Sequence, residues 1–196
     1  GMVLEFIESI GPQRRGEVIR FGHSLDCDES VLLVGAPLDR VHGVMCGTVN
    51  AYWRDSKTLI TTHEAILWPD PAWRESGARF GESVAYSGYS SEAVGVVGIP
   101  IPEGDGSTLS GAAVFTRDGM PGDGNWTLST TLIDPDTLAQ DAVGSSVDVL
   151  RGYIVLGAPG AGPNGPQSGA AFLYLHSPSA DIWVKQTRLS GYLSEA

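Results

Sequence analysis

Acidic side chains are the residues of this sequence with the most obvious chemical potential. The chain carries 23 Asp and Glu against 12 Lys and Arg, for a net charge of -11. Paired carboxylates can move protons or bind a cation through their oxygens. Solvated loop charge that keeps an apolar protein soluble is the simpler interpretation, and we favour it. The loop acids concerned are Glu103, Asp105, Asp118, Asp123, Asp134, Asp136 and Asp141.

A metal is therefore not expected, and no cofactor is predicted. If a cation does bind, the first place to look is Asp134, Asp136 and Asp141, between one predicted outer strand and the next repeat. The sequence contains four histidines, and none pairs with another at a ligand spacing such as HxxxH or HExxH.

Nucleophilic catalysis finds equally little support. Ser24, Ser83 and Ser146 occupy the same place in three repeats, which is typical of a residue needed for folding, and no GxSxG motif occurs. The glycine-rich stretch 157–166 lacks the lysine of a phosphate-binding P-loop. We therefore expect a protein that is not an enzyme.

Composition restricts the partners. Hydrophobic residues make up 42% of the chain and charged residues 18%, as in a folded globular protein. The excess of acids repels phosphate backbones, so nucleic acid is not expected as a partner. No apolar run is long enough to cross a bilayer. Cys27 and Cys46 leave two possibilities open, a disulfide or two buried thiols.

The elements that must position these residues recur three times. The first motif is an apolar residue followed by glycine, any residue and serine, and the glycines lie 59 and 63 residues apart. Its copies begin at Phe21-Gly22, Phe80-Gly81 and Val143-Gly144. The second motif is a β-branched run that closes in glycine and proline. Its copies end in Gly35-Ala36-Pro37, Gly98-Ile99-Pro100 and Gly157-Ala158-Pro159.

Each unit of about 60 residues offers four runs of strand length. A third motif of glycine with small and aromatic residues follows the proline, and an outer run follows that motif. In the outer run 127–132, alternation predicts that Leu128, Thr130 and Leu132 face one side of the sheet. A single sheet of this kind leaves apolar faces exposed, and stacking on similar sheets buries them.

These FG and GAP motifs resemble the FG-GAP repeats that form the blades of the seven-bladed propeller in integrin α subunits. Similar repeats occur in bacterial surface and secreted proteins. The resemblance implies an all-β fold of β-propeller-type blades: three four-stranded antiparallel sheets plus an extra N-terminal strand over residues 4–10. The expected array is a single domain. Its parts are an outer strand in 1–17 and repeats over 18–76, 77–139 and 140–196.

Two departures from the family pattern matter. Many integrin-type repeats carry a DxDxDG calcium loop between the FG and GAP strands. The turns at 26–30, 87–92 and 149–152 lack that pattern, so calcium is not carried over. Three repeats also fall short of a full ring. We therefore expect a partial propeller, or one that is completed by homo-oligomerisation.

Recognition should reside in the loops that follow each GAP motif, because they differ most between repeats. Candidate ligand-binding residues are Asp39, Arg40, His42, Glu103, Asp105 and Asn164. Trp53, Trp68 and Trp73 could add aromatic contacts, although blade packing is the simpler role. The predicted function is an extracellular or cell-surface binding or adhesion module for a protein or carbohydrate. The alternatives are part of an extracellular hydrolase or lyase, and a fragment of a longer propeller.

Overall fold

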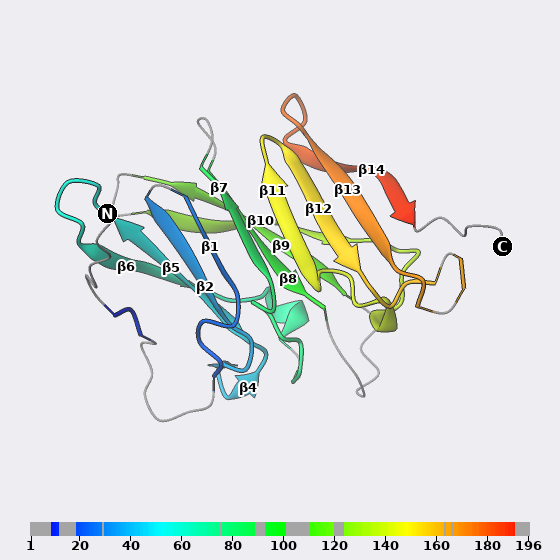
Figure 1. The fold of residues 1–196 in the computed structure, drawn as a ribbon, viewed down its shortest axis with the longest axis horizontal. Coiled ribbons are helices and arrows are strands. Elements are labelled where there is room, and N and C mark those ends of the chain that lie inside the picture. Colours follow the sequence, from blue (N-terminus) through cyan, green and yellow to red (C-terminus); the bar gives the residue numbers. More distant parts are fainter. Residues whose placement is uncertain are drawn as a thin grey trace, which may run out of the picture.

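Three antiparallel sheets stand side by side along the long axis of the molecule (Figure 1). The computed structural model describes residues 9–11, 19–28, 30–74, 76–88, 93–100, 110–119, 124–162, 164–165 and 167–190. Within these residues, each sheet has four strands, and chain neighbours pair with one another. The predicted all-β, propeller-type blade architecture is confirmed. The N-terminal strand expected over 4–10 lies largely outside the described residues, and Ser9 and Ile10 are not in a strand.

Each sheet corresponds to one repeat of the sequence. Sheet 1 contains β1 (Leu25–Cys27), β2 (Val31–Ala36), β5 (Thr48–Arg54) and β6 (Thr61–Leu67). Sheet 2 contains β7 (Val84–Ser87), β8 (Ala93–Ile99), β9 (Gly111–Asp118) and β10 (Asn125–Ile133). Sheet 3 contains β11 (Ser146–Leu150), β12 (Tyr153–Ala158), β13 (Ala170–Ser177) and β14 (Ile182–Ser190).

Three smaller elements lie in the connections. A short hairpin of β3 (Arg40–Val41) and β4 (Val44–Met45) follows the first GAP motif. The 3-10 turn η1 (Pro71–Trp73) links sheets 1 and 2, and η2 (Ala139–Asp141) links sheets 2 and 3. No helix among the described residues is long and apolar enough to cross a membrane.

The two apolar cores lie between neighbouring sheets. Leu33 and Val49 of sheet 1 pack with Phe80 and Ile99 of the second repeat. A second core joins Val96, Val114 and Leu132 of sheet 2 to Ile154, Leu156 and Phe172 of sheet 3. Between sheets, β7 lies against β1 and β2 of sheet 1 and against β11 of sheet 3. Sheet 2 is therefore covered on both faces, as a blade in a propeller is.

The FG motif forms the same turn in all three repeats. In each turn, the residue three positions on donates its N–H to the carbonyl of Arg20, Arg79 or Ala142. The FG glycines Gly22, Gly81 and Gly144 have φ of 87°, 87° and 88°. Glycine adopts this conformation without strain at the third position of a type II turn. The recurrence of glycine in the motif therefore has a backbone cause.

The GAP motif joins each sheet to the next. Ser24 Oγ donates to the carbonyl of Gly81 at 2.8 Å, and Ser83 Oγ donates to that of Gly144 at 2.7 Å. The GAP glycine leaves room for this approach: a β-carbon on Gly35 would collide with the Gly81 carbonyl. We call this contact of serine, GAP glycine and the next FG carbonyl the blade joint. Two of the three recurring serines, Ser24 and Ser83, therefore have the structural role that the sequence predicts.

A β-bulge corrects the prediction for the outer strand of sheet 2. The register between β9 and β10 shifts between Leu128 and Thr130. Leu128 therefore packs into the core shared with sheet 1, whereas Leu132 packs into the core shared with sheet 3. Simple alternation failed because the bulge adds one residue to β10 and reverses the facing of the later residues in the strand. The same shift occurs in the outer strands of sheets 1 and 3.

Both cysteines are free thiols in the structure. Cys46 is buried, and burial is the main cause that raises the pKa of its thiol. Cys27 is exposed on the innermost strand of sheet 1. Of the two alternatives left open by the sequence, the structure has no disulfide, and only one of the two thiols is buried.

Candidate functional site

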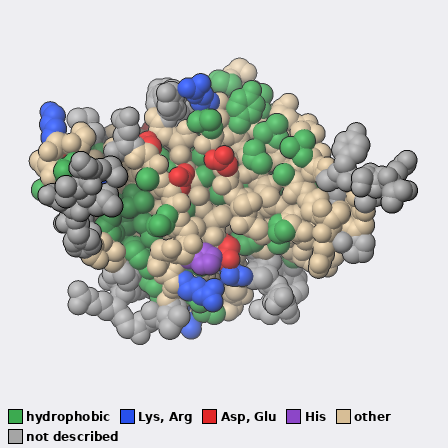
Figure 2. Space-filling model, viewed as in Figure 1, with side chains coloured by type: hydrophobic (Ala, Val, Ile, Leu, Met, Phe, Trp, Pro, Cys, Tyr) green, Lys and Arg blue, Asp and Glu red, His purple; other side chains and the backbone are tan. Residues whose placement is uncertain are grey.

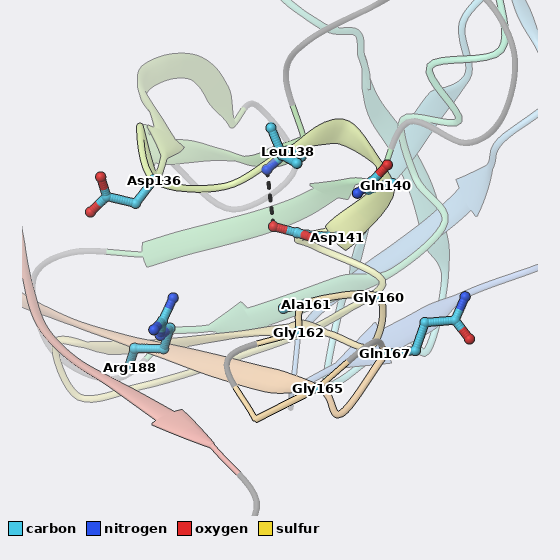
Figure 3. A pocket seen from close by; sticks show the side chains of 10 residues that line it. All are labelled: Asp136, Leu138, Gln140, Asp141, Gly160, Ala161, Gly162, Gly165, Gln167 and Arg188. Carbon is cyan, nitrogen blue, oxygen red and sulfur yellow. Dashed lines mark hydrogen bonds between the residues drawn. The ribbon is translucent and has the colours of Figure 1, made fainter.

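An open groove of about 720 Å³ lies between the second and third repeats. One wall is the loop that connects β10 to β11 and contains η2. The other wall is the loop after the third GAP motif, and β14 contributes Arg188. Its volume falls in the range of small-molecule sites. The lining residues, drawn in Figure 3, are Asp136, Leu138, Gln140, Asp141, Gly160, Ala161, Gly162, Gly165, Gln167 and Arg188.

The first wall is anchored by Asp134, whose side chain is 1% exposed. Its Oδ1 accepts the N–H of Asp136 at 3.1 Å, and its Oδ2 accepts Lys185 Nζ of β14 at 2.7 Å. Burial, with the negative charge of Asp134 as a second cause, raises the pKa of Tyr174 to about 12. The anchor therefore ties this loop to sheet 3, and the Asp134 carboxylate is already paired.

The rest of that wall is held by Asp141. Its Oδ2 accepts the N–H of Leu138 at 2.9 Å (Figure 3). The N–H of Asp141 donates to the Leu138 carbonyl at 2.9 Å. Leu138 remains 60% exposed. The side chain of Asp141 is therefore engaged by its own loop, and the apolar side chain of Leu138 is left at the surface of the groove.

The two walls are hydrogen-bonded to each other. The N–H of Gly160 donates to the Asp141 carbonyl at 3.1 Å, and a β-carbon on Gly160 would collide with the carbonyl of Gln140. The N–H of Gly169 closes the second loop on Ala161 at 2.8 Å. These bonds fix the described parts of both loops, which reduces the entropy that binding would cost.

The groove offers hydrogen bonds and charge. Asp136 contributes a carboxylate, Gln140 and Gln167 contribute carboxamides, and Arg188 contributes a guanidinium group. Among the described residues that line it, there is no histidine, cysteine or aromatic ring. This set can recognise polar groups of a ligand. It offers no activated nucleophile.

The three acids named as a possible cation site have separate roles. Asp134 is paired with Lys185, Asp141 caps Leu138, and Asp136 stands in the groove. Among the residues that the structure describes, no three His, Cys, Asp or Glu side chains gather into a cation site.

The candidate ligand-binding residues lie in different places. Asn164 belongs to the loop of the second wall, where its N–H donates to Ser168 Oγ at 3.2 Å. Asp39 is buried near the β3–β4 hairpin and accepts Thr48 Oγ1 at 2.8 Å. Arg40 and His42 lie exposed on that hairpin, away from the groove. Glu103 and Asp105 lie outside the described residues.

Sequence reasoning did not single out Leu138, Gln140, Gln167 or Arg188. No motif marks them, because they come from two loops and a strand that only stacking brings together. One signal was available: Leu138 is an apolar residue in a loop rich in acids.

The three tryptophans named as possible contact residues differ in exposure. Trp73 is buried, Trp53 is half-buried, and Trp68 is 47% exposed beside a smaller groove of about 230 Å³.

The three stacked sheets define an array of β-propeller-type blades. Within it, residues 126–174 match the family model of the FG-GAP repeat, so the chain contains an FG-GAP repeat at these residues and the resemblance is confirmed. The match runs from β10 of sheet 2 to β13 of sheet 3 and includes both loops of the groove. A search of curated proteins found no match.

Proposed function

We propose that this protein is a non-enzymatic binding module that holds a segment of another protein in the groove between repeats 2 and 3. The observation that carries the proposal is the lining itself. Two braced loops present a carboxylate, two carboxamides, a guanidinium group and an exposed leucine around backbone rich in glycine. FG-GAP repeats supply the rigid scaffold, and loops on a rigid scaffold are the usual place for recognition.

A protein segment suits this chemistry. Carboxamides both donate and accept hydrogen bonds, so Gln140 and Gln167 can pair with the N–H and C=O groups of an extended backbone. Arg188 can bind a carboxylate on the segment through two N–H groups, and Leu138 offers an apolar contact. The Asp141 carboxylate is bonded to its own loop, which favours binding over acid–base catalysis.

A carbohydrate is the second candidate, and a different place supports it. The smaller groove is lined by Trp68, Trp126 and Phe115 and also by Arg74 and Asp70. An exposed indole beside charged groups can stack on the apolar face of a sugar ring. This groove lies between the outer strands of sheets 1 and 2, so the two candidates can be tested separately.

The setting proposed for this activity is extracellular or at the cell surface, with a role in adhesion. It is supported by the occurrence of FG-GAP repeats in extracellular and surface proteins. A homo-oligomer is also proposed.

The test is a screen of the purified chain against a displayed peptide library and a glycan array. Peptides selected by the wild type should bind the Arg188→Glu variant roughly tenfold more weakly or worse, because an attractive ion pair with the ligand becomes a repulsion. Lys57→Glu makes the same charge change on an exposed loop and should leave binding intact. Glycan binding that is lost in Trp68→Ala would replace the peptide proposal with the carbohydrate one. Turnover of chromogenic glycosides or esters would contradict the non-enzymatic assignment.

A further inference from the structure

Among the residues that the structure describes, the blade joint is complete twice, and each half of it occurs once more without its complement. In the complete joints, the serine and GAP glycine of one sheet receive the FG carbonyl of the next: Ser24 receives Gly81, and Ser83 receives Gly144. We call the serine and GAP glycine the receiving half of the joint, and the FG turn that supplies the carbonyl the presenting half. The third receiving half consists of Ser146 and Gly157. The third presenting half is the FG turn of the first repeat, Phe21-Gly22.

The receiving half is exposed on the outer face of sheet 3. A β-carbon on Gly157 would meet only Ser146, whereas one on Gly98 would meet the backbone of Gly144 in the next repeat. None of the described residues therefore fills the space that the next FG carbonyl fills elsewhere. Figure 2 shows hydrophobic side chains gathered in the upper right, over β11 to β13.

Strand register identifies the apolar row on that face. Leu150 pairs with Tyr153, Tyr153 with Leu175, and Leu175 with Val184, so the four side chains share one side of the sheet. Tyr153 is 50% exposed and Leu150 is 57% exposed. The residue equivalent to Tyr153 in sheet 1 is Val31, which is 2% exposed beneath sheet 2. This face thus has the composition of a blade interface, and no sheet of the described part of the chain covers it.

The presenting half is exposed at the other end of the array. Phe80 is fully buried in its joint, whereas its equivalent Phe21 is only half-buried and Gly22 is exposed. On the next strand, Val84 is 7% exposed, whereas its equivalent Leu25 is 62% exposed. On the central strands of this face, Val34 and Tyr52 are buried, and Tyr52 Oη donates to the carbonyl of Gly11, so the exposed part is the FG turn together with β1.

We infer that two copies of this chain associate head to tail through a blade joint. Gly22 of one copy accepts from Ser146 of its partner, and Leu25 packs on the row of Tyr153. A second copy is the occupant that these surfaces specify, because each chain carries both complementary halves of a contact that it makes twice internally. The contact is heterologous, since different surfaces of the two copies meet. The inference rests on the homo-oligomer proposed above and specifies its interface, and it does not depend on the proposed ligand groove.

The test is sedimentation velocity on the full chain over a wide range of concentration. The wild type should show species above the mass of one chain, 20.6 kDa. Leu25→Glu and Tyr153→Glu should each weaken association roughly tenfold or more, because each places a charge in an apolar contact. Ile60 is as exposed as Leu25 and lies in the β5–β6 connection, so Ile60→Glu is the matched control and should associate like the wild type.

A mixture of the Leu25→Glu and Tyr153→Glu variants tests whether the contact is head to tail. Each variant retains one intact half, so an equimolar mixture should form a heterodimer at concentrations at which either variant alone stays monomeric. That recovery also shows that both variants are folded. A wild type that stays monomeric at every concentration overturns the inference. Association that survives Leu25→Glu and is lost only in Tyr153→Glu also overturns it, because sheet 3 would then pair with itself.

Discussion

Glu64 illustrates how one residue couples two blades. Its side chain is fully buried, and Arg117 of sheet 2 binds it through two hydrogen bonds of 2.9 and 2.5 Å. Trp126 Nε1 donates to the same carboxylate at 3.2 Å, and the N–H of Gly124 donates at 3.3 Å. Burial acts to raise the pKa of Glu64, but the hydrogen bonds from Arg117 and Trp126 outweigh it and hold the pKa below 4.5.

Arg117→Met should therefore destabilise the fold by about 3 kcal/mol, because it leaves a carboxylate buried without its cation. Urea unfolding measures this change. Arg188→Met is the control, since the same substitution on exposed β14 should cost little. The double variant Glu64→Gln with Arg117→Met should recover part of the loss. Equal losses in the free energy of unfolding for Arg117→Met and Arg188→Met would contradict a stabilising pair between Glu64 and Arg117.

The pH dependence follows from the same pair and is part of the same prediction. A carboxyl group whose folded-state pKa is lowered stabilises the fold above its ordinary pKa, here 4.5. That contribution is lost as the pH falls through the lowered value. The wild type should therefore lose stability on acidification below about pH 4.5, and Arg117→Met should lose less over the same range.

At the scale of elements, the blade joint explains why the FG and GAP motifs recur together. The FG turn needs glycine for its positive φ, and the GAP strand needs glycine so that the FG carbonyl of the next repeat can approach. Gly98 and Gly157 occupy the same position in successive repeats, but only Gly98 faces a completed joint. Comparing the same substitution at Gly98 and at Gly157 therefore separates the energetic effect of the joint from the effect that alanine has on the strand itself.

Gly98→Ala should destabilise the protein by about 2–3 kcal/mol, because its β-carbon collides with the backbone of Gly144. Gly157→Ala should cost no more than about 1 kcal/mol, since only the side chain of Ser146 must move. Urea unfolding of dilute protein, where copies stay separate, makes the comparison. A loss at Gly157 as large as that at Gly98 would show that the joint is not the cause.

At the scale of the whole molecule, stability is expected to be highest in the middle. Sheet 2 is covered on both faces by the two apolar cores, whereas the described residues leave one face of sheet 3 exposed. In an array of repeats, each unit draws stability from its neighbours. Opening should therefore begin at the ends of the array.

Hydrogen exchange measured by mass spectrometry should find the slowest amides in β8 and β9 of sheet 2. Amides of β14, the exposed outer strand of sheet 3, should exchange much faster. Dilute protein is again required, because association through sheet 3 would protect it. If the amides of β14 exchange as slowly as those of β8 in dilute protein, the array is not less stable at its end than in its middle, and the prediction is wrong.

The sequence by itself determined the repeats, four strands in each and the positions of the turns. These features depend on local chemistry: glycine at positive φ, proline at strand ends and β-branched runs. The alternation of residues predicted the wrong side of the sheet for Leu128 relative to Leu132, because a bulge in the pairing of β10 with β9 lies between them. It also gave no warning that Asp39 would be buried.

Only the tertiary structure decided the groove and the open faces. Asp136, Gln167 and Arg188 are far apart in the chain and meet because sheets 2 and 3 stack. Glu64 and Arg117 meet for the same reason across sheets 1 and 2. Whether a given FG or GAP motif ends up buried or exposed depends on its place in the array. Three copies of nearly the same motif therefore have different environments, a difference that arises from neighbours and not from the residues themselves.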